Sequence, residues 1–227
     1  MITEKINAIL FGATGMVGEG VLHECLKHPD IESVLVINRR SCGVNHEKLR
    51  EIIHTDFLDF STIENELAGQ NACYFCMGVS SIGKKEEEYT RLTYDLTMHV
   101  TNTLVKLNPE MTFCYISGAG TDSTEKGRSM WARVKGKTEN DLMKLQFKVC
   151  YMFRPGYIQP TKGLKNTYKF YKVVAPIYPL IKFLFSKSVC TLQEIGQSMI
   201  NVTLYGSDKQ ILECKDIVQQ SKARIRQ

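Results

Sequence analysis

The stretch from Ile6 to Gly20 constrains the fold of this 227-residue chain more than any other part of the sequence. It opens with a short apolar run, Ile6 to Phe11, which predicts a buried strand. Glycines follow at Gly12, Gly15 and Gly18, and apolar residues then recur with helical spacing up to Pro29. The pattern therefore predicts a strand, a glycine-rich turn and a helix in immediate succession.

Each of the three glycines has a physical reason in such a unit. Gly12 allows the tight turn, Gly15 allows a pyrophosphate to approach the backbone, and Gly18 allows helix and strand to pack closely. The helix N-terminus adds unpaired N–H groups and a positive dipole end, which favour an anion. The stretch is typical of a dinucleotide-binding turn, and a glycine-rich turn without a ligand is the alternative. No Gly-Lys-Ser/Thr follows, which disfavours a phosphate loop for nucleoside triphosphates.

Strand-like and helix-like segments alternate through the rest of the chain, which predicts βαβ units and a parallel sheet. The predicted fold class is α/β, a doubly wound parallel sheet with a small, mainly helical C-terminal extension. We expect residues 1–160 to form a dinucleotide-binding domain and residues 161–227 to form a substrate or lid segment that packs on it. The expected strands cover residues 6–11, 33–37, 49–54, 71–77, 112–116, 148–153 and 211–214. The expected later helices cover residues 84–107, 131–145 and 191–205, with capping-box patterns at Ser61-Thr-Ile-Glu64 and Thr191-Leu-Gln-Glu194.

Composition narrows the class of protein and its setting. The net charge of +5 is mild and its basic residues are scattered, so nothing resembles a nucleic-acid patch. The first residues run directly into a strand, which disfavours a secretion signal, and the eight cysteines then indicate a reduced, cytoplasmic protein. Cys73 and Cys76 lie three apart on a predicted strand, so they point to opposite faces. With no metal-ligand spacing among the five histidines, no metal site is expected.

The residues after the second and third strands bear on the choice of cofactor. Arg39 and Arg40 stand where an NAD-binding protein usually places an acidic residue for the ribose 2′-hydroxyl. Two arginines suit a 2′-phosphate, so NADP(H) is favoured over NAD(H). Alternatively, both arginines are solvated loop charges. Asp56 and Phe57 can contact the adenine amino group and ring, or they are a turn residue and a core residue.

Residues 165–187 are aromatic, basic and interrupted by prolines. The longest uncharged apolar run is far too short to span a membrane. A hydrophobic lid over a substrate pocket or a subunit interface is the preferred interpretation, and an interfacial membrane contact is the alternative.

The sequence resembles the atypical, epimerase-like short-chain dehydrogenases/reductases, in particular the branch that contains the Tat-interacting protein. The resemblance rests on Phe11-Gly-Ala-Thr-Gly-Met-Val-Gly18, Asn38-Arg39-Arg40, Asp56-Phe57, Val134-Lys135-Gly136 and Arg154-Pro155-Gly156. It implies a Rossmann domain, with substrate held by the variable C-terminal part. It also implies that NADP(H) is bound by Gly12, Thr14, Gly15, Met16, Val17, Gly18, Asn38, Arg39, Arg40, Asp56, Phe57, Cys76, Gly78, Lys135 and Pro155.

The same resemblance assigns proton transfer to a Ser after the fifth strand and a Tyr-x-x-x-Lys on the next helix. Ser117 and Lys135 match the first and last of these residues, but Trp131 stands in place of the tyrosine. An indole N–H can donate a hydrogen bond but is no acid or base near neutral pH. Ser117, Thr121 or Tyr157 could substitute as donor, although Tyr157 also suits a pocket wall.

Three functions are therefore compatible with the sequence. The first is an NADP-dependent oxidoreductase or epimerase-like enzyme that acts on a small carbonyl or sugar-like substrate through a modified site. The second is a non-catalytic NADP(H)-sensing or scaffold protein, which Trp131 favours. The third, a membrane-associated carrier protein, rests only on the aromatic, basic segment near Tyr168 to Phe185.

Overall fold

A seven-stranded parallel sheet forms the centre of the protein, as seen in a computed structural model that describes residues 5–166 and 185–223. The strand order is β3-β2-β1-β4-β5-β6-β9, so the order reverses between β1 and β4. All seven predicted strands are confirmed, with ends that shift by a few residues. Their bounds are β1 (Ile6–Phe11), β2 (Ile31–Asn38), β3 (Leu49–Ile53), β4 (Ala72–Phe75), β5 (Thr112–Ile116), β6 (Val149–Arg154) and β9 (Ile211–Glu213).

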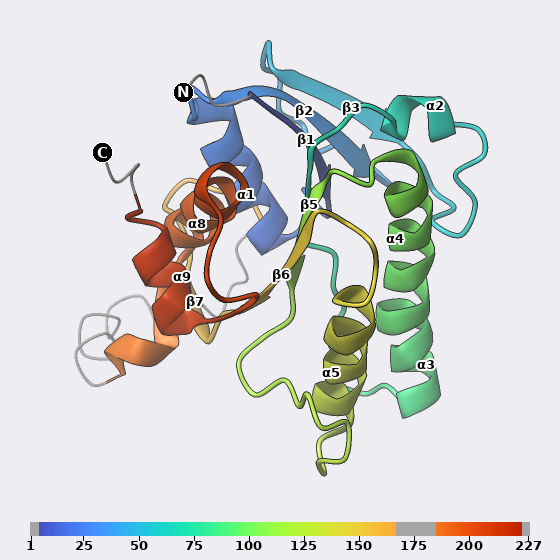
Figure 1. Cartoon of the computed structure of the whole chain (residues 1–227), viewed down its shortest axis with the longest axis vertical. Helices are drawn as coiled ribbons and strands as arrows, with labels where there is room; N and C mark the ends of the chain where they lie inside the picture. Colours follow the sequence, from blue (N-terminus) through green and yellow to red (C-terminus); the bar gives the residue numbers. More distant parts are fainter. Residues whose placement is uncertain (1–4, 167–184, 224–227) are drawn as a thin grey trace.

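Helices cover both faces of the sheet, which confirms the doubly wound fold (Figure 1). On one face lie α1 (Met16–Lys27), α8 (Leu192–Tyr205) and α9 (Cys214–Gln220). On the other face lie α2 (Glu64–Leu67), α4 (Leu96–Leu107) and α5 (Met130–Leu142). The C-terminal residues thus supply both an edge strand and two helices of the same layered structure.

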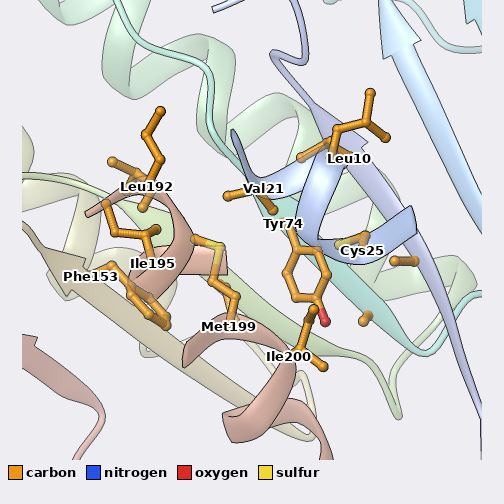
Figure 2. Packing of buried hydrophobic residues seen from close by; sticks show 14 of the residues in the cluster. Leu10, Val21, Cys25, Tyr74, Phe153, Leu192, Ile195, Met199 and Ile200 are labelled. Atoms are coloured by element: carbon orange, nitrogen blue, oxygen red, sulfur yellow. The ribbon is translucent and has the colours of Figure 1, made fainter. Parts of the chain in front are cut away.

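The core under α1 and α8 holds α1, the helix that follows the glycine-rich turn, against the sheet. Figure 2 shows Tyr74 of β4 among Val21 and Cys25 of α1 and Met199 and Ile200 of α8, and the Tyr74 side chain is fully buried. Its phenol oxygen lies 3.2 Å from Thr203 Oγ1, so the buried hydroxyl has a hydrogen-bond partner. The position of α1 is therefore fixed by packing from two directions.

The helix predicted over residues 84–107 is wrong in one respect. It consists of α3 (Glu86–Thr90), a π-helical turn η1 (Arg91–Asp95) and α4. A π turn inserts an extra residue per turn, and apolar spacing of three or four does not reveal it.

Other differences concern short elements. The pattern at Ser61 does not make a capping box, because α2 begins at Glu64 without a side-chain cap. The box at Thr191 is confirmed, with both reciprocal hydrogen bonds formed. A parallel pair, β7 (Tyr157–Gln159) and β8 (Val189–Thr191), and helix α9 were not expected.

The aromatic segment expected to be a lid or an interface falls mainly on residues 167–184, which lie outside the described residues. Within the parts of the chain that the structure describes, no helix has the length and apolar character needed to cross a membrane.

Close packing at Gly18 yields the first prediction. A Cβ at Gly18 would lie 2.1 Å from the carbonyl oxygen of Gly12, so Gly18→Ala must force α1 away from the end of β1. We expect a loss of about 2 kcal/mol in the free energy of unfolding, measured by urea denaturation. Gly15→Ala is the control, because its Cβ would lie 3.4 Å from the same oxygen, an ordinary contact. Equal losses in the two variants would contradict this assignment of Gly18.

Candidate functional site

A cleft opens at the carboxyl ends of β1 and β4, the point where the strand order reverses. In open α/β sheets this switch point is where ligands bind. Residues from the ends of four neighbouring strands and from the helix after β4 form its walls. They are Gly12, Thr14, Gly15, Ile37, Asn38, Arg39, Phe57, Cys76, Met77, Gly78, Val79, Leu92 and Leu96.

The floor of the cleft is the turn between β1 and α1. Gly12 has φ +86°, a conformation that favours glycine, and its carbonyl accepts the Gly15 N–H at 3.0 Å. Gly15 is the N-cap of α1 and makes no side-chain capping bond. The following N–H groups, from Met16 to Gly18, belong to the first helical turn, where a helix has no internal partners for them. The result is an uncapped helix N-terminus, which favours an anion.

The one acidic residue in the first turn of α1, Glu19, is directed elsewhere. Glu19 is buried, and its two carboxylate oxygens each accept a backbone N–H, from Lys165 and Asn166, at 2.7 Å. Glu19 therefore ties the chain after β7 to the helix that carries the glycine turn.

Basic residues lie where β2 ends beside the cleft. Asn38 is buried, whereas Arg39 and Arg40 are exposed. Of these three residues, Asn38 and Arg39 line the cleft and Arg40 does not. Within residues 5–166 and 185–223, neither guanidinium forms an ion pair. Both are thus available to an external anion.

The two residues after β3 occupy different positions relative to the cleft. Phe57 is 5% exposed and packs edge-to-face on Phe11 with ring centroids 6.1 Å apart, yet it also lines the cleft. Asp56 is exposed and its Oδ1 accepts the Leu58 N–H at 2.9 Å, so it stabilises a turn and does not line the cleft.

The opposite wall contains residues that were not named singly as site candidates from the sequence. Met77 and Val79 flank Gly78 in the loop that follows β4. Their place after a parallel strand was a usable signal, because such loops lie beside the ligand. Leu92 lies in η1 and Leu96 begins α4, both within the helix predicted over residues 84–107.

Two catalytic candidates are brought together outside the cleft lining. The Lys135 Nζ of α5 donates a hydrogen bond to the backbone carbonyl of Ser117, directly after β5. The Ser117 hydroxyl is buried and donates to the Phe153 carbonyl at 3.1 Å. Burial of the Lys135 ammonium lowers its pKa to about 8, and the nearby Glu139 carboxylate opposes this shift.

The remaining candidates lie on α5 or in the segments that follow β5 and β6. Trp131 is half-buried, and its ring would lie 3.5 Å from a Cβ added at Gly120. The Thr121 hydroxyl donates to the Gly118 carbonyl at 2.7 Å, and the Tyr157 hydroxyl donates to Gln159 Oε1 at 3.2 Å. Pro155 is buried, and its carbonyl accepts the Ala119 N–H at 2.8 Å.

A buried ion pair orients the helix that carries Lys135. Arg154, the last residue of β6, donates from Nε to both carboxylate oxygens of Glu139 at 3.1 Å. Its other nitrogens reach Ser123 Oγ at 2.5 Å and Glu213 Oε1 at 3.3 Å. Because Glu139 is fully buried, loss of Arg154 would leave an unpaired charge in the core.

Within the described residues, no group of three or more His, Cys, Asp or Glu could hold a metal ion.

The site has the features of the dinucleotide-binding Rossmann class: a parallel sheet, a glycine turn and an uncapped helix end at the switch point. The NAD dependent epimerase/dehydratase family model matches residues 8–126, more than half of the 227-residue chain, and the protein belongs to this family. The predicted relation to atypical short-chain dehydrogenases/reductases is confirmed.

Curated relatives include fungal proteins of low identity. The protein FMP52, mitochondrial, of Debaryomyces hansenii is 23% identical over 167 residues, 71% of this chain and 72% of that protein. The protein fmp52-1, mitochondrial, of Aspergillus oryzae is 27% identical over 158 residues, 67% of this chain and 66% of that protein. The expectation of a cytoplasmic protein is contradicted by these relatives, which are named mitochondrial. Cysteine content could not reveal this, since reduced thiols are not restricted to one compartment.

Solved structures share the fold. The UDP-N-acetylglucosamine 4-epimerase of Methanobrevibacter ruminantium, in complex with UDP-N-acetylmuramic acid, superposes with a TM-score of 0.65 at 15% identity, covering 92% of this chain and 75% of that one. The Bordetella bronchiseptica enzyme WbmF, in complex with NAD+, gives a TM-score of 0.67 at 11% identity, covering 97% and 78%. At these identities the likeness establishes the architecture alone.

The pKa of Lys135 makes a prediction about alkaline stability. The folded-state pKa of about 8 lies below the ordinary value of 10.5, so between these values the unfolded chain binds more protons. Stability from this residue therefore rises with pH across that window, by about 3 kcal/mol in total. We expect the free energy of unfolding of the native protein to increase relative to Lys135→Met from pH 7.5 to 10.5, measured by urea denaturation. A pH-independent difference would contradict the assigned burial.

Proposed function

We propose that the protein binds NADP(H) in preference to NAD(H) at this cleft and acts as an oxidoreductase or epimerase-like enzyme on a small carbonyl or sugar-like substrate. The observation that carries the proposal is the uncapped N-terminus of α1 in the cleft that Arg39 lines, with Arg39 and Arg40 forming no ion pair among the described residues. The family supports a nicotinamide dinucleotide, and the arginines support the phosphorylated form.

The residues present fit such a dinucleotide. Among the described residues, leaving aside its chain neighbours and the helix's own backbone, the atom within 4 Å of a Cβ added at Gly15 is the Gly12 carbonyl oxygen, 3.4 Å away, so no side chain from elsewhere in the described chain fills the cradle at the helix end. The pyrophosphate would rest against the N–H groups of Met16 to Gly18, with Thr14 beside it. Phe57 would face the adenine, and Cys76, Gly78 and Lys135 would hold the other half. The bound cofactor would supply or accept a hydride.

The residues available for proton transfer differ from the Ser and Tyr-x-x-x-Lys pattern, because Trp131 replaces the tyrosine. Trp131 cannot transfer a proton near neutral pH, and the hydroxyls of Ser117 and Thr121 donate to backbone carbonyls. Lys135, with a pKa of about 8, is the group among these that can gain or lose a proton near neutral pH. Catalysis would then depend on Lys135 with a reoriented Ser117 or with Tyr157.

Trp131 also favours a second function, a non-catalytic NADP(H)-sensing or scaffold protein. In that case the cofactor would bind tightly without turnover, and a panel of carbonyl substrates would leave NADPH unoxidised.

The names of the fungal relatives lead us to propose that either function operates in mitochondria. Cell fractionation followed by protease protection tests this proposal, and recovery outside the mitochondrial fraction would refute it.

Reading of the 2′-phosphate is tested by the double variant Arg39→Ala/Arg40→Ala. Loss of charge-assisted hydrogen bonds should weaken NADPH binding by about 1.5 to 3 kcal/mol per contacting arginine, with little change for NADH, measured by calorimetric titration. Arg50→Ala is the matched control, because Arg50 is exposed nearby but pairs with Glu66 at 2.7 Å. Equal losses for both cofactors would show that Arg39 and Arg40 do not read the 2′ position.

The catalytic role of position 131 is tested by Trp131→Tyr. This change places a phenol four residues before Lys135, and a neighbouring ammonium favours the phenolate. We expect NADPH-dependent reduction to appear or to rise by about 100-fold with at least one carbonyl substrate. Trp131→Phe is the control, since it removes the indole without adding an acid. No difference between the two variants would assign the limitation to another group.

A further inference from the structure

A carboxylate on β3 holds the turn that carries the two arginines. β2 ends at Asn38 and pairs in parallel with β3, with Val36 opposite Glu51. Because side chains alternate along a strand, Asn38 lies on the same face of the sheet as Val36 and hence as Glu51. The Glu51 side chain therefore lies on the same face of the sheet as Asn38, where the turn from Asn38 to Cys42 begins.

Three donors from both ends of this turn converge on Glu51. Its Oε1 accepts the Asn38 side-chain amide at 3.0 Å and the Cys42 backbone N–H at 2.8 Å. Its Oε2 accepts the Ser41 hydroxyl at 2.6 Å. Arg39 and Arg40 are the residues between these anchors, and neither of them pairs with Glu51 in the described structure.

These hydrogen bonds determine the state of the carboxylate. Partial burial raises the pKa of Glu51, but the bonds from Ser41, Cys42 and Asn38 outweigh it and the net pKa is lowered. A carboxylate has about four acceptor positions, and three are occupied by the turn. Glu51 therefore accepts hydrogen bonds from the protein's own backbone and side chains and is not presented to a ribose hydroxyl.

We propose that Glu51 is a positioning residue for cofactor selectivity, which fixes the turn from Asn38 to Cys42 so that Arg39 and Arg40 face the 2′-phosphate of NADP(H). The inference rests on the proposed function, since it concerns the same cleft. It adds a residue outside the cleft lining, on β3, whereas the arginines lie in the turn after β2. Without this anchor the arginines would sample many positions, and the entropy lost on binding would rise.

The test compares dissociation constants for NADPH and NADH in the native protein, Glu51→Ala and Glu51→Gln, by calorimetric titration. Glu51→Ala removes all three bonds and should reduce the NADPH:NADH selectivity by about tenfold or more, with NADH affinity within about threefold. Glu51→Gln is the matched variant, because its amide oxygen can still accept from Cys42 and Asn38. It should keep selectivity within about threefold of native.

The ratio of affinities separates positioning from a general structural role, because partial unfolding would weaken both cofactors together. Ser41→Ala, which removes only the Oε2 bond, provides a second measurement should Glu51→Ala fail to fold. It should lower selectivity by about threefold. Unchanged selectivity in both Glu51→Ala and Ser41→Ala would overturn the proposal, as would equal losses in Glu51→Ala and Glu51→Gln. Absence of NADPH preference in the native protein would instead overturn the proposed function.

Discussion

The contact between Gly18 of α1 and the carbonyl of Gly12 is the constraint on which the site depends. No side chain fits between these two residues, so the first turn of α1 packs directly against the turn that follows β1. The turn of Gly12, Thr14 and Gly15 thereby lines the cleft at the point where the strand order reverses. The core around Tyr74, packed against both α1 and α8, keeps the helix in that position (Figure 2).

The sheet could be predicted because its strands are strongly apolar and its helices strongly periodic. The turn at Gly12 and the capping box at Thr191 could also be predicted from the sequence, because both depend on interactions between residues that are close in the chain. The π turn at Arg91–Asp95 could not be foreseen, because its backbone hydrogen bonds leave no side-chain pattern. Ser61 shows the opposite error, in which a matching pattern is overridden because the chain enters α2 from a different turn.

The cleft was predicted better than the catalytic side. Glycines and arginines next to strand ends are constrained by local geometry, and the structure gathers Gly12, Gly15, Asn38 and Arg39 around one cleft. The environments of Lys135 and Ser117 depend on contacts between α5, β5 and β6, which sequence spacing cannot specify. The same holds for Glu51, whose partners lie 9 to 13 positions earlier in the chain.

The most direct measurement of the central claim follows the backbone amide signals of Met16, Val17 and Gly18 by NMR while NADPH is added to isotope-labelled protein. If the uncapped end of α1 receives the pyrophosphate, these signals shift among the most strongly and saturate together with those of Arg39. If they stay in place while NADPH binds, or if no signal in the chain responds, the helix end is not the cofactor site.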